Sequence, residues 1–473
     1  MVYNVSRYLL YEGNDLFLNT FNIDDFSHNS HIHFIGIGGI SMSGLAEILL
    51  GRGYTVSGSD MSESPLTEKL RSLGAEVFIG QRASNIKNCD LIVYTAAISP
   101  DNEEFIAAQA SGAVVIDRAT LLGSVMKSYK YAVAVAGTHG KTSTTSMMTH
   151  IMLAAECDPT VSIGGELASI GGNIRVGKSD YFVCESCEYH GSFLKFFPYI
   201  SMILNVEADH LDYFRGIDHI IETFRSFALL VPDDGAVVAN IDNENVVKTV
   251  SGIDRRIITC SVKSPDADYY ARNIKYNNGF GEFEICEKGA PLGTIRLSVP
   301  GCHNVSNAVC AVAAARYLGL SIKKIAQGLF EYKGVGRRFE IKGERNGALL
   351  IDDYAHHPTE ISATLATAKN MDCKNIYCVF QPHTYTRTKA LFDDFVTALS
   401  CGINIIITDI YAAREKDTGI VSSKQLADAI DGAVYIKEFS DCAEYLKEKT
   451  QPGDLVITMG AGSVFKIGDM FLE

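Results

Sequence analysis

The sequence predicts a three-domain α/β protein in which each domain is built on a mainly parallel sheet. Short apolar runs alternate with helical patterns along the chain, which is typical of parallel strands covered by helices on both faces. Two strand–glycine turn–helix units stand at residues 31–51 and 131–152. The length of 473 residues allows about two to four domains. We expect domain limits of 1–128, 129–333 and 334–473.

Composition excludes several classes of protein. A formal net charge of −14, with no basic block, argues against a nucleic-acid binder. No apolar run is long enough to span a bilayer, and acidic residues interrupt Met1–Asn29, so we expect no signal peptide. The twelve cysteines are scattered, and no second pair accompanies the C-x-x-C of Cys184 and Cys187. They predict free thiols in a reducing, cytoplasmic location rather than a zinc site.

The first domain begins with a strand from His31 and a glycine-rich turn. This unit is similar to the Rossmann-like dinucleotide fingerprint, but its third glycine is replaced by Ser41. A pyrophosphate would fit at the start of the helix that follows, and an acidic residue about twenty positions on suits a ribose hydroxyl. A tight turn that serves packing alone is the alternative. The candidate nucleotide-binding residues are Gly36, Ile37, Gly38, Gly39, Ile40, Ser41, Met42 and Asp60.

Further short strands and helical patterns complete the first domain. Their alternation indicates a parallel sheet with helices on both faces. The expected strands are 54–58, 76–79, 90–95 and 113–116, and the expected helices are 66–73, 102–111 and 119–126.

The central domain opens with a buried strand at 131–136 and a second glycine turn. Small and β-branched residues form the strand, and a helical pattern follows Lys141. Backbone N–H groups, a lysine and a hydroxyl in this order suit a nucleoside triphosphate with its Mg²⁺. The match to the P-loop pattern is incomplete because Val135 replaces its first glycine, and a turn that contains Gly-Lys-Thr by chance is the alternative. The candidate triphosphate-binding residues are Gly137, Thr138, His139, Gly140, Lys141, Thr142 and Ser143.

Carboxylates and an imidazole follow two further strands of the central domain. Glu185 and Glu188 come after a strand that starts at Asp180, and Asp209 and His210 come after the apolar run 199–205. The carboxyl ends of parallel strands meet at one edge of a sheet, and oxygen ligands suit Mg²⁺. Alternating residues in 261–300 predict antiparallel hairpins added to this domain.

The third domain follows a glycine hinge and is Rossmann-like. Arg337 and Arg338 come first, and either a phosphate-binding role or a solvated basic pair would explain them. Four apolar strands then end in polar or glycine residues, which indicates one binding crevice. They are the strand from Leu349 to Asp352-Asp353-Tyr354-Ala-His356-His357-Pro358, 376–380 before Gln381 to Arg387, 405–408 before Asp409, and 454–459 before Gly460.

From His31 to Met459 the chain resembles the Mur ligases of peptidoglycan synthesis. The marks occur in the order G-I-G-G-I-S-M-S-G from Gly36, G-T-H-G-K-T from Gly137, E-S-C-E-Y from Glu185, Asp209-His210, His303-Asn304, R-R-F-E from Arg337 and D-D-Y-A-H-H-P from Asp352. Several motifs in one order are more specific than any single motif. Ser41 and Cys302 depart from the commoner Gly and Arg, which leaves fine substrate contacts open.

The resemblance implies an ATP-dependent ligase with Mg²⁺ that adds L-alanine to UDP-N-acetylmuramate through an acyl phosphate. Its first domain would bind the UDP part, its second ATP and its third the amino acid, with closure on substrate. By this resemblance, Lys141 and Arg338 would bind the γ-phosphoryl group, and Thr142, Glu185 and His210 would bind the metal. His303 and Asn304 would contact adenine, and Asp353 would contact the ribose or the phosphates. Tyr354, His356 and Arg387 would orient alanine, and His356 would also accept the proton of its amine. Helix 217–230 has no lysine, so we expect no carbamylated lysine.

Three alternatives stay open at this point. A ligase that joins a whole tripeptide to the same nucleotide shares both glycine turns. A nucleotide-binding scaffold would bind ATP without forming an amide. A nicotinamide dehydrogenase would use the turn from Gly36 alone, although Ser41 and the second phosphate loop argue against it. The oligomeric state is also open, with a homodimer among the options.

Overall fold

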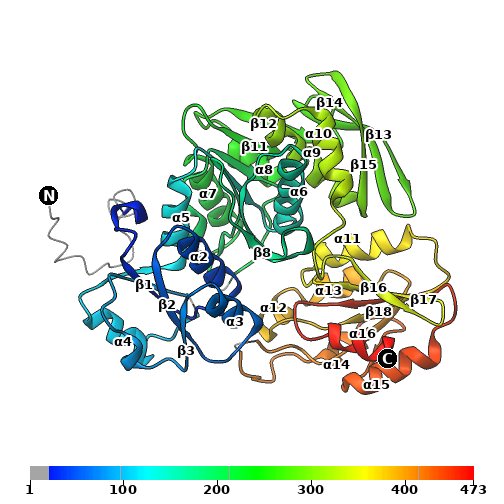
Figure 1. Cartoon of the computed structure of the whole chain (residues 1–473). Coiled ribbons are helices and arrows are strands. Elements are labelled where there is room, and N and C mark those ends of the chain that lie inside the picture. The colour runs from blue at the N-terminus through cyan, green and yellow to red at the C-terminus, as the bar shows by residue number, and fades with distance from the viewer. Residues whose placement is uncertain (1–20, 96, 212, 414) are drawn as a thin grey trace. The chain divides into compact units, whose positions relative to one another are not determined.

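The computed structural model describes residues 21–95, 97–211, 213–413 and 415–473. It confirms the predicted three-domain α/β class: three sheets follow one another along the chain, as the colour gradient of Figure 1 shows. The chain forms two compact units. One runs up to Tyr269 and includes Cys310–Gly328, and the other consists of Tyr270–Val309 and Leu329–Glu473. The expected domain limits at 128 and 333 stay predictions.

The first sheet has the order β3-β2-β1-β4-β5, and all its neighbouring strands are parallel. The chain order reverses between β1 and β4, and the glycine turn directly follows β1. Open parallel sheets bind ligands at such a reversal. The elements are β1 (His31–Ile35), α2 (Ile40–Gly51), β2 (Thr55–Asp60), α3 (Pro65–Ser72), β3 (Glu76–Ile79), β4 (Leu91–Tyr94), α4 (Glu103–Ala110), β5 (Val114–Asp117) and α5 (Arg118–Lys127).

The part of the second sheet that lies in the first unit has the order β12-β11-β10-β6-β9-β7-β8. Its pairs are parallel except β7 with β8, so the sheet is mixed. The elements are β6 (Tyr131–Ala136), α6 (Lys141–Ala154), β7 (Thr160–Leu167), β8 (Gly172–Arg175), β9 (Tyr181–Ser186), β10 (Ile200–Ile203), α7 (Ile217–Ala228), β11 (Ala236–Asn240), α8 (Glu244–Val250) and β12 (Ile257–Ser261).

Strands β7, β8 and β12 were not expected from the sequence. Two glycines interrupt β7, and β8 is only four residues long, so neither has a clear apolar pattern. The predicted antiparallel hairpins in 261–300 are confirmed, since β14 and β15 pair antiparallel. The elements of this stretch and of the helices that follow are β13 (Tyr269–Asn277), β14 (Phe280–Glu287), β15 (Ala290–Pro300), α9 (Cys302–Tyr317) and α10 (Ile322–Glu331).

The third sheet has the order β16-β17-β21-β18-β19-β20, and only β16 is antiparallel to its neighbour. The four strands expected here are confirmed as β17, β18, β19 and β21. The elements are β16 (Glu340–Arg345), β17 (Ala348–Asp353), α11 (Pro358–Lys369), β18 (Ile376–Phe380), α12 (Tyr385–Ala390), α13 (Phe392–Leu399), β19 (Asn404–Ile407), α14 (Ser423–Asp428), β20 (Val434–Tyr435), α15 (Phe439–Lys449), β21 (Leu455–Met459) and α16 (Phe465–Leu472).

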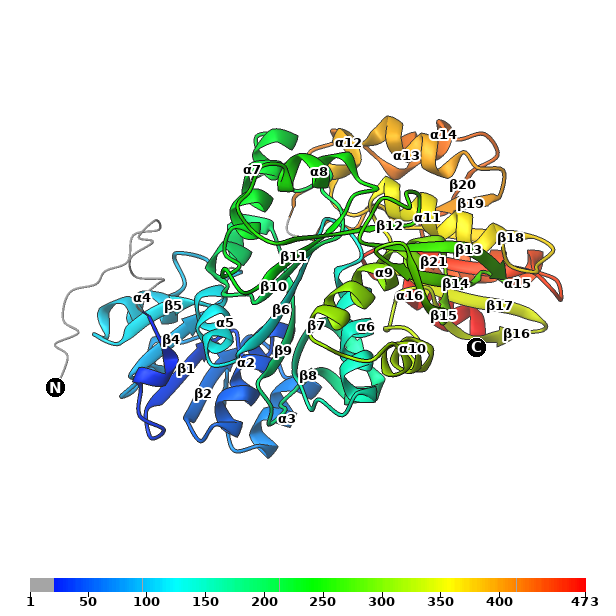
Figure 2. The ribbon, with the colours of Figure 1, turned by 90° about the horizontal axis from the view of Figure 1, so that it is seen from above.

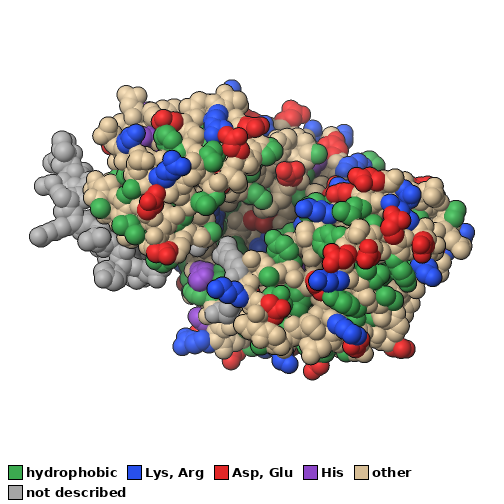
Figure 3. Space-filling view, turned by 90° about the horizontal axis from the view of Figure 1, so that it is seen from below, with side chains coloured by type: hydrophobic (Ala, Val, Ile, Leu, Met, Phe, Trp, Pro, Cys, Tyr) green, Lys and Arg blue, Asp and Glu red, His purple; other side chains and the backbone are tan. Residues whose placement is uncertain are grey.

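The surface shows charges of both signs. On the face drawn in Figure 3, acidic and basic side chains are interspersed among neutral and apolar ones. This mixture agrees with the absence of a basic block from the sequence. Within the residues that the structure covers, no helix combines the length and the apolar character that a membrane span requires.

Two glycines allow helices of the first sheet to pack closely on the central domain, one on β8 and one on the segment that follows β9. In Figure 2, α2 lies beside β8, and a Cβ on Gly44 of α2 would collide with the Ile174 side chain. Gly123 in α5 is more constrained, because a Cβ there would collide with the backbone carbonyl oxygen of Lys195. A flexible side chain can rotate away, whereas a backbone carbonyl cannot move alone.

Gly123→Ala should therefore destabilise the protein by about 1–3 kcal/mol, although alanine normally favours a helix over glycine. Chemical denaturation would measure this loss. The matched control is Gly51→Ala, also in a helix, whose added Cβ would stand 3.7 Å from Val176 Cγ1 and make an ordinary contact. Equal stability of the two variants would contradict the prediction.

Candidate active site

The turn between β6 and α6 forms the predicted phosphate loop. Gly140, the residue before α6, has a left-handed backbone with φ of 82°, which favours glycine. The Lys141 ammonium folds back over the loop and donates to the carbonyl oxygens of Gly137 at 2.5 Å and Thr138 at 3.2 Å. The loop thus brings Gly137, Gly140 and Lys141 together in the arrangement that the sequence predicts.

Lys141 also forms a buried ion pair with Glu188. Lys141 Nζ lies 3.1 Å from Glu188 Oε2, and the carboxylate side chain is only 3% exposed. Burial alone would lower the pKa of Lys141, but the Glu188 carboxylate outweighs it and the pKa is raised on balance. Sequence reasoning counted Glu188 among the acids suited to a metal and missed its pairing with Lys141. Glu188 is the second glutamate of the E-x-x-E motif that begins with Glu185 at the end of β9.

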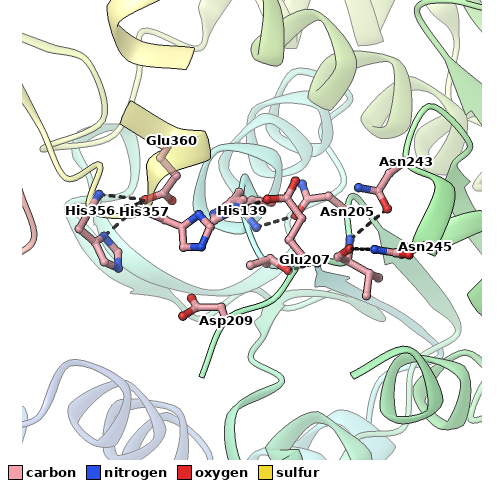
Figure 4. Close-up of polar contacts among 12 residues, drawn as sticks. His139, Asn205, Glu207, Asp209, Asn243, Asn245, His356, His357 and Glu360 are labelled. Atoms are coloured by element: carbon pink, nitrogen blue, oxygen red, sulfur yellow. Dashed lines mark hydrogen bonds and ion pairs between the residues drawn. The ribbon is translucent and has the colours of Figure 1, made fainter. Parts of the chain in front are cut away.

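The loop after β10 is hydrogen-bonded to the phosphate loop. Asn205 accepts from the His139 N–H at 2.7 Å and donates to the His139 carbonyl oxygen at 3.1 Å, and Figure 4 shows the two residues side by side. The Glu207 N–H donates to the Thr138 hydroxyl at 2.9 Å. Asn245 donates to the carbonyl oxygen of Val206 at 2.9 Å, which fixes this loop in turn. Sequence reasoning assigned no role to Asn205.

The three predicted metal ligands lie on three separate elements. Thr142 stands in the first turn of α6. Glu185 Oε1 accepts from the Gly164 N–H at 2.7 Å. The His210 ring packs 4.5 Å from that of Tyr189. No contact joins the three side chains to one another in the part of the chain that the structure describes.

In the first sheet, the glycine turn and Asp60 do come together. Gly36 has φ of 86°, and Gly38 donates its N–H to Asp60 Oδ2 at 2.8 Å. The side chains of Ile37 and Met42 are buried, so these residues can offer a ligand only their backbone. Ser41 and Ile40 begin α2, whose preceding residue Gly39 provides no side-chain cap.

The paired arginines of the second unit have different partners. Arg337 Nε lies 2.9 Å from Asp352 Oδ2, and the same guanidinium donates to the Gly460 carbonyl oxygen at 2.7 Å. Arg338 lies further from a carboxylate, with its Nη1 3.7 Å from Glu360 Oε1, and its guanidinium stands 5.0 Å from the Tyr354 ring centre. Arg337 is therefore committed to the fold, and Arg338 is better placed to bind a ligand.

Glu360 also positions His356, a role that sequence reasoning did not assign. His356 Nδ1 lies 2.9 Å from the Tyr354 carbonyl oxygen and 3.4 Å from Glu360 Oε2, and Glu360 accepts from the His356 N–H at 3.1 Å (Figure 4). Burial lowers the pKa of His356 to about 4, against the opposing Glu360 carboxylate. The imidazole is therefore neutral at pH 7. Its ring centre lies 5.7 Å from that of His383, which in turn contacts Arg387 Nη1 at 3.3 Å.

The expected adenine and ribose residues belong to the second unit, in which Asn304 and Asp353 are buried and His303 is partly exposed. Burial lowers the pKa of His303 to about 4, so its ring is neutral at pH 7. The Asn304 side chain donates to the Pro300 carbonyl oxygen at 2.7 Å, and its Oδ1 accepts from Asn307 Nδ2 at 3.4 Å. Asp353 accepts from the Phe339 and Ala355 N–H groups, and burial raises its pKa to about 6. Cys302, beside His303, is exposed.

Three family models match this chain in succession. Residues 31–130 match "Mur ligase family, catalytic domain", residues 135–315 match "Mur ligase middle domain", and residues 337–462 match "Mur ligase, glutamate ligase domain". Together they cover most of the 473 residues.

Curated relatives match over nearly the full length. UDP-N-acetylmuramate–L-alanine ligase of Acetivibrio thermocellus is 52% identical over 448 residues, which cover 94% of this chain and 96% of the relative. The ligase of the same name from Clostridium acetobutylicum is 52% identical over 447 residues, which cover 93% of this chain and 97% of the relative.

Solved structures agree with the fold. The UDP-N-acetylmuramate-alanine ligase of Thermotoga maritima superposes with a TM-score of 0.78 at 28% identity, over 93% of this chain and 98% of that one. A murein peptide ligase of Psychrobacter arcticus gives a TM-score of 0.70 at 25% identity, over 94% and 98%. From the three family models and the near-full-length relatives, we conclude that this chain belongs to the Mur ligase family.

Proposed function

We propose that this chain is an ATP-dependent ligase that joins L-alanine to UDP-N-acetylmuramate in peptidoglycan synthesis. The observation that carries the proposal is the 52% identity to curated L-alanine ligases over 94% of the chain. In the reaction, the lactyl carboxylate attacks the γ-phosphate of ATP, the alanine amine attacks the resulting acyl phosphate, and phosphate leaves. A cytoplasmic location, where ATP is supplied, is part of the proposal.

The phosphate loop would bind ATP. Carboxylate and triphosphate are both anionic, so the reaction needs fixed positive charge near the transferred phosphoryl group. Lys141 and Arg338 would supply it, Lys141 by exchanging Glu188 for phosphate oxygens. His303 and Asn304 would contact adenine and Asp353 the ribose or phosphates. The loop residues proposed for the triphosphate are Gly137, Thr138, His139, Gly140, Lys141, Thr142 and Ser143.

Mg²⁺ is proposed as the metal, with Thr142, Glu185 and His210 as its protein ligands. A hydroxyl, a carboxylate and an imidazole form a suitable donor set, and Glu185 uses Oε1 for the Gly164 N–H while its second oxygen is available to a cation. Bound there, the metal would neutralise charge on the phosphate oxygens.

The other two substrates would use the first and third sheets. The glycine turn at the β1–β4 reversal suits the UDP part, through Gly36, Ile37, Gly38, Gly39, Ile40, Ser41, Met42 and Asp60. Tyr354, His356 and Arg387 would orient L-alanine. His356 is suited to accept the amine proton because its imidazole is neutral above a pKa of about 4.

The first prediction from the proposed function tests the reaction and its phosphate loop. Phosphate release should require ATP, Mg²⁺, UDP-N-acetylmuramate and L-alanine together, and Lys141→Ala should lower its rate at least about 100-fold because phosphoryl transfer loses a positioned charge. The control is Lys178→Ala, an exposed lysine of the same unit. Release with a tripeptide but not with L-alanine would instead favour the tripeptide ligase, and ATP binding without any release would favour the scaffold.

The second prediction concerns proton transfer. His356→Gln keeps a hydrogen-bonding side chain of similar size but cannot accept a proton, so kcat with L-alanine should fall about 100-fold while the Kd for ATP changes little. Steady-state kinetics and calorimetry would measure the two quantities. His28→Gln is the matched control at an exposed position. An unchanged kcat for His356→Gln would remove the histidine from the mechanism.

The third prediction concerns stability against pH. The pKa of His356 is about 4 in the folded chain and about 6.5 when unfolded, so the unfolded state binds more protons in this window. The free energy of unfolding should therefore fall as the pH drops from 6.5 to 4, by at most about 3 kcal/mol from this residue. Asp353, whose pKa is raised to about 6, raises the free energy of unfolding as the pH drops below 6, and it does so equally in the parent protein and in His356→Gln.

Denaturant titrations at several pH values should show a shallower loss for His356→Gln than for the parent protein. Parallel curves would mean that His356 titrates normally in the folded state.

A further inference from the structure

The guanidinium of Arg118 has a specific place that the proposed mechanism does not yet use. Arg118 is the first residue of α5, and its Nη1 donates to the Ser41 hydroxyl in the first turn of α2 at 2.8 Å. The bond joins residues 77 positions apart and brings a cation to the glycine turn of the first sheet.

Arg118 has no carboxylate within ion-pair distance among the residues that the structure describes. The neighbouring Asp117 is occupied: it accepts from the Ala119 and Thr120 N–H groups and pairs with Lys195 Nζ at 2.6 Å. Burial lowers the pKa of Arg118, because the charged form is removed from water without a direct counter-ion. A partly buried cation with spare N–H donors is a place for an anionic ligand.

The start of α2 offers further donors beside this cation. The N–H groups of Ile40, Ser41 and Met42 have no acceptor among the described residues, as is usual for the first turn of a helix. The first turn also has no acidic residue. Asn173 fixes the turn by donating to the Ile40 carbonyl oxygen at 2.8 Å.

We propose that Arg118, positioned by Ser41, binds the diphosphate of the UDP substrate at the start of α2. This inference rests on the proposed function, and it adds a residue to the UDP site. Its forked N–H groups would take phosphate oxygens that the helix N–H groups also bind. Ser41 departs from the glycine of the dinucleotide fingerprint, and its hydroxyl supplies the acceptor that directs the guanidinium, which a glycine could not do.

Calorimetric titration with UDP and with UDP-N-acetylmuramate, without ATP, tests this inference. Arg118→Gln should raise the Kd for both ligands by the same factor, about ten-fold or more, because both carry the diphosphate. Arg118→Lys should give a smaller loss, since it keeps the charge without the fork. Ser41→Ala should raise the Kd about two- to five-fold, and should add little to Arg118→Gln in the double variant. Arg71→Gln, an exposed arginine paired with Glu63, is the control.

The outcomes separate the inference from the function on which it rests. Unchanged Kd values in Arg118→Gln would overturn it, as would weaker binding of UDP-N-acetylmuramate with unchanged binding of UDP, which would place the contact at the lactyl carboxylate. If Arg118→Gln fails to unfold cooperatively, Arg118→Lys and Ser41→Ala decide by the same criteria. A parent protein that binds UDP-N-acetylmuramate but releases no phosphate with L-alanine would defeat the proposed function, while the Kd comparison would still decide the role of Arg118.

Discussion

A largely buried ammonium group at the start of α6 is the constraint on which the central site depends. Lys141 stands where a helix N-terminus already concentrates positive charge, so it needs a counter-charge when no phosphate is bound. Glu188 provides it at 3.1 Å, and two carbonyl oxygens of the loop complete the shell. The loop therefore keeps its shape around the Lys141 ammonium, and the oxygens of a triphosphate can replace Glu188 as its partner.

The same principle governs the glycine turn of the first sheet. There too the first turn of the helix contains no acidic residue, although Asp60 accepts from the Gly38 N–H just before it, and a cation, Arg118, comes from another helix. Both turns follow a buried parallel strand. Such a strand is apolar along its length, so the polar groups that can bind a ligand lie beyond its carboxyl end. Close packing at Gly44 fixes α2 against β8, and close packing at Gly123 fixes α5 against the segment that follows β9.

The second unit keeps its ionisable groups under different control. Burial makes His303 and His356 neutral at pH 7, and Glu360 orients His356 and faces Arg338. A neutral imidazole can accept a proton, whereas an imidazolium cannot. Arg337 looks equivalent to Arg338 in sequence, yet it binds Asp352 and two carbonyl oxygens of the loop after β21.

The sequence by itself determined the α/β class, the two glycine turns, the four strands of the third sheet and the family resemblance, because apolar runs and turn residues are local signals. It missed β7, β8, β12, β16 and β20. Glycines interrupt β7 and β16, and β8 and β20 are only four and two residues long. Only the tertiary structure decided which side chains pair: Lys141 with Glu188, His139 with Asn205, Arg118 with Ser41, and Arg337 rather than Arg338 with Asp352. Most of these partners lie far apart in the chain, and sheet order and helix packing, which no local pattern encodes, bring them together.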